Sequence, residues 1–248
     1  MTRPSYDHRQ VVIIPKICSL LRSLGPSTYD DVAPKVEYWI ECALNDHSIP
    51  VGQLAEQVAS VPWTSSHGSH ASVVRFLKEF RDALHRSEQA KTFINDLCTH
   101  VLRWFTAASA EDAITMEQGM MWSGSWVVMH GGRGFISAAS FVGNLVERGL
   151  LSHDLVRRLL VKSLIAHHYT DRDGVQKSVR AMAIYKLFVT AGNTLLQGLL
   201  DPEDVEACFK TLDAKISLKG VVGPNAGKLN VLYSSYPSAS RQKLATNL

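Results

Sequence analysis

The sequence predicts an all-α protein in which antiparallel helical pairs stack into a superhelix. Apolar residues recur at the helical spacing of three and four along most of the 248 residues, and no segment alternates convincingly as a half-buried strand would. Short connectors join the predicted helices, which favours antiparallel neighbours. Each pair has one apolar stripe that a neighbouring pair must cover, so we expect about five pairs to form a single curved stack.

The predicted helices follow one another from the N-terminus with recognisable ends. The first is expected at residues 8–24, with a kink or restart at Pro15, and a Gly-Pro pair ends it. Ser27 or Thr28 is a suitable cap for the second, whose apolar stripe runs from Val32 to Leu44. The remaining predicted helices cover residues 50–59, 69–85, 87–107, 111–129, 135–148, 152–167, 174–191 and 202–218.

Some local features refine this pattern. Trp122 and Trp126 are four residues apart, so the predicted helix at 111–129 would carry them on one face. The glycine-rich residues 130–134 are expected to form a loop. Because no low-complexity linker divides the chain, we expect one domain over residues 1–236, followed by a basic, disordered tail at 237–248.

Composition places the chain among soluble globular proteins. Apolar residues make up 46% and charged residues 20% of the sequence. No run approaches the roughly 20 apolar residues that span a bilayer, and residues 1–10 lack the apolar core of a signal peptide. We therefore expect a monomer in the cytosol or nucleus. The four cysteines lack zinc-ligand spacing and are expected to be buried, reduced thiols; they are Cys18, Cys42, Cys98 and Cys208.

The formal net charge of +3 does not by itself indicate a nucleic-acid-binding protein. Basic residues nevertheless gather in the second half of the chain, where Arg157, Arg158 and Lys162 form a candidate RNA-binding face. Such a face could contact phosphates or an acidic protein surface. The alternative is an ordinary solvated helix face.

The near-matches to catalytic and metal motifs are incomplete. Residues 223–228 resemble a phosphate-binding loop but are one residue short, and Lys228 precedes a leucine where magnesium would need a hydroxyl. His67 and His70 have no Cys or Glu at ligand spacing and are expected in an exposed loop. The sequence therefore predicts no catalytic residue, cofactor or metal, and a protein that is not an enzyme. A catalytic pair assembled only by the fold remains the alternative.

Three parts of the chain resemble the middle domain of eukaryotic initiation factor 4G, a HEAT-like stack of helical pairs found in translation, splicing and nonsense-decay scaffolds. They are residues 20–30, residues 141–145 with 149–152, and residues 187–192 with Leu195. Their order fits a whole domain. Gly143 would let two helices approach closely, while Gly149 and Gly192 would end helices. Many relatives carry a run of arginines where this chain has residues 131–134.

The resemblance implies a platform for a DEAD-box RNA helicase of the initiation-factor type. The implied contact residues are Leu24, Pro26, Tyr29, Asn225, Lys228 and Asn230. The first three lie at the N-terminal proline turn and the others near the C-terminus, so each group would meet one helicase lobe. Core packing is the alternative role of Leu24 and Tyr29, and helix termination is that of Pro26.

Two functions other than a helicase platform are also compatible with the sequence. A HEAT-like adaptor could have lost helicase binding and hold a different protein. An enzyme could be hidden in the helical fold. Salt-sensitive RNA binding would favour the helicase-associated scaffold, because phosphate contacts release counterions.

Overall fold

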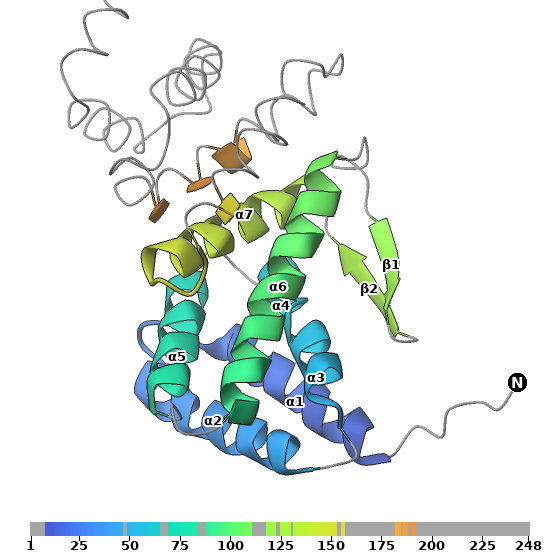
Figure 1. Ribbon diagram of the computed structural model, residues 1–248, viewed down its shortest axis with the longest axis vertical. Coiled ribbons are helices and arrows are strands. Elements are labelled where there is room, and N and C mark those ends of the chain that lie inside the picture. Colours follow the sequence, from blue (N-terminus) through green and yellow to red (C-terminus); the bar gives the residue numbers. More distant parts are fainter. Residues whose placement is uncertain are drawn as a thin grey trace, which may run out of the picture. The chain divides into compact units, whose positions relative to one another are not determined.

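The computed structural model describes residues 8–46, 49–64, 69–83, 88–110, 118–122, 125–129 and 131–152, and short pieces at 155–156, 182–184, 186–187 and 190–191 (Figure 1). Their elements are α1 (His8–Ser23), α2 (Tyr29–Asn45), α3 (Val51–Val58), α4 (Val61–Thr64), α5 (His70–Ala83), α6 (Glu88–Ala110), β1 (Gln118–Trp122), β2 (Ser125–Met129) and α7 (Gly131–Glu147). The described part is thus helical apart from one hairpin. The helical class is confirmed at that level, while the number of pairs and their superhelical stacking stay predictions.

The chain divides into two compact units. One contains residues 1–105 and 117–130, and the other contains residues 106–116 and 131–248. The first unit holds α1 to α5, most of α6 and the hairpin. The second holds α7 and the short described pieces that follow it.

The turn between α1 and α2 follows the prediction closely. The Thr28 amide donates to the Gly25 carbonyl at 3.2 Å, which places Pro26 at the turn position that its fixed φ favours. Thr28 precedes α2 as expected, but its hydroxyl does not cap that helix. The hydroxyl instead accepts from the Gly25 amide at 2.9 Å and donates to the Ser23 carbonyl at 2.7 Å. Thr28 therefore ties the end of α1 to the start of α2.

The helices of the first unit meet along apolar stripes with helical spacing. Helix α1 is continuous through Pro15 and buries Ile17 and Leu21 completely. The core side of α2 carries Val36 and Ile40, both without exposed surface. Each such side chain contributes roughly 1.5–3 kcal/mol by leaving water.

Helices α3, α5 and α6 lie close to their predicted positions and complete this core. Phe80 on α5 packs against Phe76 of the same helix and Phe93 of α6, with ring centroids 5.8 and 6.4 Å apart. The sulfur of Cys18 on α1 lies 3.8 Å from the Gln57 carbonyl oxygen on α3. These contacts join segments that are far apart in sequence into one core.

The helix predicted at 111–129 is wrong over residues 118–122 and 125–129, which form two antiparallel strands. Their register pairs Trp122 with Ser125 and Met121 with Trp126, so the two tryptophans belong to neighbouring cross-strand pairs. Aromatic and β-branched residues favour strands, and a two-residue connection containing Gly124 is typical of a hairpin. The four-residue spacing of the tryptophans is compatible with a helix, but the turn signal between them favours the hairpin.

Helix α7, in the second unit, begins earlier and ends where predicted. Residues 131–134 belong to α7, so the loop predicted there is wrong over these positions. Glycine is tolerated near the start of a helix. At the other end the Leu150 amide donates to the Leu145 carbonyl at 2.8 Å and the Gly149 amide to the Val146 carbonyl at 3.0 Å. This is a Schellman motif, and Gly149 supplies the positive φ of 69° that it requires.

Gly143 lies where another helical piece of the second unit comes close to α7. A Cβ atom built at this position would lie 2.8 Å from the Thr190 Cβ and 3.3 Å from the Leu187 carbonyl oxygen. Real side chains do not approach that closely, so the position requires glycine. The close approach predicted at Gly143 is confirmed. Gly192, most of the helices predicted at 152–167 and 174–191, the one at 202–218, and the tail lie outside the described residues.

Candidate protein-interaction surface

The corner between α1 and α2 contains three of the predicted contact residues, and it buries two of them. Leu24 has no exposed surface and Tyr29 only 6%. Pro26 is exposed, as is Ser27 beside it in the turn. Leu24 and Tyr29 therefore take the core-packing role that was the alternative, and the surface open to a partner at this corner is that of the turn itself.

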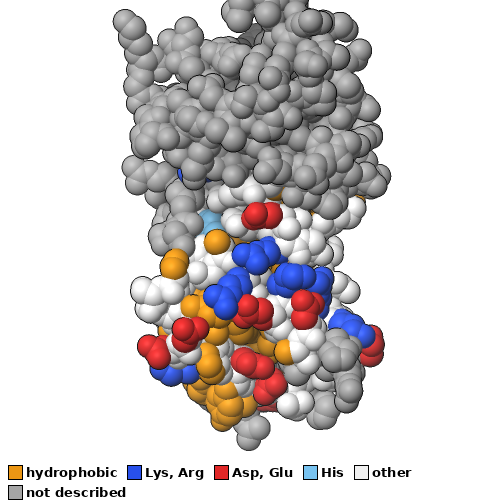
Figure 2. Space-filling view, turned by 90° about the vertical axis from the view of Figure 1, so that its left-hand side faces the viewer, with side chains coloured by type: hydrophobic (Ala, Val, Ile, Leu, Met, Phe, Trp, Pro, Cys, Tyr) orange, Lys and Arg blue, Asp and Glu red, His pale blue; other side chains and the backbone are white. Residues whose placement is uncertain are grey.

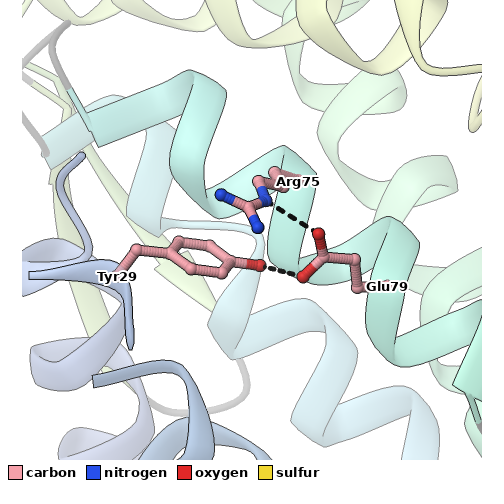
Figure 3. A network of polar contacts seen from close by, with 3 residues as sticks. All are labelled: Tyr29, Arg75 and Glu79. Carbon is pink, nitrogen blue, oxygen red and sulfur yellow. Dashed lines mark hydrogen bonds and ion pairs between the residues drawn. The ribbon is translucent and has the colours of Figure 1, made fainter. Parts of the chain in front are cut away.

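Tyr29 is held by a polar network that joins α2 to α5 (Figure 3). Its hydroxyl donates to Glu79 Oε2 at 2.5 Å, and Arg75 Nε donates to Glu79 Oε1 at 2.7 Å. The Arg75 guanidinium carbon lies 4.0 Å from the centroid of the Tyr29 ring, in cation–π geometry. One arginine therefore contacts both the aromatic ring and the carboxylate that accepts a hydrogen bond from the ring's hydroxyl.

The electrostatics of this network keep Tyr29 protonated. Burial raises the pKa of Tyr29 well above its usual value, and the hydrogen bond and charge of Glu79 raise it further. The same carboxylate raises the pKa of Arg75. At neutral pH the hydroxyl therefore acts as a hydrogen-bond donor, with no tendency to serve as a base or nucleophile.

The exposed side of α5 carries charges that are paired with one another. Besides the Arg75–Glu79 pair, Asp82 lies 3.4 Å from Lys78 and 3.2 Å from Arg81. Figure 2 shows basic and acidic side chains interleaved on one face of the described part, next to apolar side chains. Pairs of this kind contribute little to stability in water, but they leave little net charge for a partner.

The exposed side of α2 differs from that of α5, and the sequence analysis did not single it out. Tyr38 is 60% exposed, and its ring lies edge-on to Trp39 with centroids 5.7 Å apart. Asp31 and Pro34 are exposed and Glu41 is half-buried. The signal was present in the sequence, because these residues lie opposite the buried stripe of Val36 and Ile40 when the helix is drawn as a wheel.

The three cysteines of the described residues are free thiols. Burial raises the pKa of Cys18 to about 11 and that of Cys98 to about 12, so neither is a thiolate at neutral pH. The prediction of buried, reduced thiols is confirmed for these two, whereas Cys42 is half-buried and Cys208 lies outside the described residues.

Neither a metal cluster nor a membrane span is found in the described ranges. No three His, Cys, Asp or Glu side chains gather there at metal-binding distance. His70 is buried at the start of α5, so the expectation of an exposed loop is wrong for it, and His67 lies outside the described part. No described helix is both long and apolar enough to cross a bilayer.

The other predicted site residues fall in parts of the chain that the structure does not describe. These are the C-terminal contact residues Asn225, Lys228 and Asn230 and the basic residues Arg157, Arg158 and Lys162. The structure therefore brings together only the N-terminal group of predicted contact residues.

Comparison with known proteins identified no relative of this chain. No protein-family model matches the chain, and no curated protein or solved structure matches it either.

Proposed function

We propose that this chain is a HEAT-like helical scaffold of the initiation factor 4G middle-domain type, and that it binds a DEAD-box RNA helicase within a messenger-RNP. The close approach of α7 at Gly143 to Thr190 carries the proposal, since both residues belong to segments in which the resemblance lies. The resemblance implies a glycine at position 143 because two helices would approach each other closely there. The helix-ending role predicted for Gly149 adds a second point of support.

Such a scaffold would act by presenting surfaces rather than by chemistry. The exposed proline turn at Pro26 and Ser27 would meet one helicase lobe, and Asn225, Lys228 and Asn230 would meet the other. Arg157, Arg158 and Lys162 would contact RNA phosphates, with an affinity that falls as salt rises.

A second candidate is an adaptor of the same fold that holds a different protein. The burial of Leu24 and Tyr29 favours it, because it removes two of the three expected helicase contacts at the α1–α2 corner. Only the turn residues remain there for a helicase to meet.

An ATPase titration separates these two candidates. The protein is added to an initiation-type DEAD-box helicase with RNA, as wild type, as Ser27→Arg in the exposed turn and as Thr99→Arg on the exposed side of α6. We expect a saturable rise in ATPase rate that Ser27→Arg abolishes and Thr99→Arg retains. No change in rate and no complex on a sizing column would favour the adaptor.

A further inference from the structure

The outer face of α2 has the composition of a binding surface that lacks its partner. We define this face by Asp31, Pro34, Tyr38 and Glu41, which follow one another at spacings of three and four residues along the helix. It lies opposite the buried stripe of Val36 and Ile40. Tyr38 at its centre is one of the few large apolar side chains with most of its surface exposed among the described residues. Rigid amphipathic rings of this kind are common anchors in protein interfaces.

The charge on α2 indicates what kind of partner fits. The helix carries four carboxylates, Asp30, Asp31, Glu37 and Glu41, against the single lysine Lys35, a formal charge of −3. Within the described part of the chain, none of these four carboxylates forms an ion pair. On α5, by contrast, both Glu79 and Asp82 are paired with basic side chains.

Pro34 adds a further acceptor to this surface. Proline has no amide hydrogen, so the Asp30 carbonyl cannot receive the helical hydrogen bond that residue 34 would normally donate. Carboxylate and carbonyl oxygens therefore outnumber basic groups along α2, where Lys35 is the one basic side chain. A partner that complements them must bring hydrogen-bond donors and positive charge.

The protein already shows how such a partner group would bind. At the inner side of the same helix, Arg75 lies over the ring of Tyr29 while it donates to the carboxylate of Glu79 (Figure 3). The outer face also carries a tyrosine and a carboxylate, Tyr38 and Glu41, three residues apart on one helix, while the Tyr38 hydroxyl hydrogen-bonds the Cys42 side chain. Arginine suits this position better than lysine, because its planar group can stack on a ring and donate to a carboxylate at once.

We propose that the outer face of α2 docks an arginine-bearing, cationic segment of another protein, with one guanidinium over Tyr38 and further basic groups at the carboxylates. This goes beyond the scaffold function by giving the chemistry of a partner and the surface that receives it. It does not depend on the partner being a helicase.

Fluorescence anisotropy with defined peptides tests the proposal. The probe is a labelled amphipathic peptide with arginines on one side and leucines beside them, and its counterparts carry lysine or glutamate in place of arginine. We expect saturable one-to-one binding of the arginine peptide, weaker binding of the lysine peptide and none of the glutamate peptide. The affinity should fall as salt rises from about 50 to about 300 mM.

Two variants and a matched control locate the site. Tyr38→Ala, and separately the double variant Asp31→Lys with Glu41→Lys, should each weaken arginine-peptide binding about tenfold. The control double variant, Asp82→Lys with Glu88→Lys on α5 and α6, makes the same change in net charge at exposed positions and should bind like wild type. Circular dichroism confirms that each variant is folded.

Three outcomes would overturn the proposal. Equal loss in the control double variant would mean that only net charge matters. If Tyr38→Ala bound the arginine peptide as tightly as wild type, the Tyr38 ring would take no part in binding. Self-association that the outer-face variants abolish would make a second copy of the chain the occupant. None of these results bears on the helicase assay, so the two proposals fail separately.

Discussion

The inner and outer faces of α2 make opposite use of similar side chains. The inner face buries Val36 and Ile40 and begins with Tyr29, whose hydroxyl and ring are both occupied by α5. The outer face exposes Tyr38 among carboxylates that have no ion pair within the described residues. One helix thus provides stability on one side and an open surface on the other. Substitutions on the two sides should therefore separate effects on folding from effects on binding.

The largest effect on stability is expected from the inner face. Ile40→Ala removes a side chain with no exposed surface and leaves a cavity between helices. We expect the free energy of unfolding to fall by about 2–5 kcal/mol, measured by urea denaturation. Lys35→Ala, on the exposed part of the same helix, is the control and should change little. Equal losses in the two variants would mean that the inner face is not the stabilising one.

A smaller loss is expected at the start of the helix. Tyr29→Phe keeps the ring under Arg75 and removes only the hydrogen bond to Glu79. We expect the free energy of unfolding to fall by about 1 kcal/mol at neutral pH, because Glu79 is half-exposed and water can replace part of the bond. A loss as large as that of Ile40→Ala would contradict this reading of the network.

The pH dependence of the same variant gives an independent check. The pKa of Tyr29 is raised in the folded protein, chiefly by burial, whereas an unfolded tyrosine titrates near pH 10, at about its reference value. The stabilisation is therefore complete below about pH 10 and is lost as the pH rises through the folded pKa. The stability gap between wild type and Tyr29→Phe should therefore stay constant up to about pH 9 and narrow as the pH rises above about 10. A gap that widens over this range would refute the assignment.

The same two faces show how far the sequence could predict the molecule. The spacing of apolar residues predicted the positions of α1, α2, α3, α5 and α6, because burial imposes helical periodicity on the sequence. It also indicated which residues of α2 face inward. It could not show that Arg75, far along the chain, would lie over Tyr29, since that contact depends on how two helices pack.

The predictions for the hairpin and for the residues of the α1–α2 corner were wrong for other reasons. Residues 118–122 and 125–129 form strands because local turn chemistry and β-propensity outweighed the four-residue spacing of two tryptophans. Leu24 was expected at a contact surface because of its place in a resembling segment, yet it is part of the core. A segment comparison reports which residues recur and does not distinguish a residue that binds from one that packs. The exposure of Tyr38 follows from the same spacing, because Tyr38 lies opposite the predicted buried stripe of α2.

Arg75 tests how much the polar network contributes beyond the hydrogen bond. Arg75→Gln keeps most of the side-chain length and removes the charge over Tyr29 and beside Glu79. Since both charged side chains are about half exposed, we expect a smaller drop in melting temperature than for Tyr29→Phe, and one that shrinks as salt is added. Lys78→Gln is the matched control, because Lys78 forms an i,i+4 pair with Asp82 at 3.4 Å and, among the described residues, makes no cation–π contact like that of Arg75. An equal drop in the control would mean that the ring adds nothing.

The smallest effect on stability is expected at Tyr38, and it is the most informative. Tyr38→Ala removes a ring that is mostly in water and substitutes a better helix former, so the melting temperature should stay the same or rise slightly. A clear fall would place Tyr38 in the packing of the unit and leave the outer face without its anchor. Unchanged stability together with lost peptide binding would assign the ring to recognition, because a side chain that does not hold the fold together can affect binding only through what it contacts outside the protein.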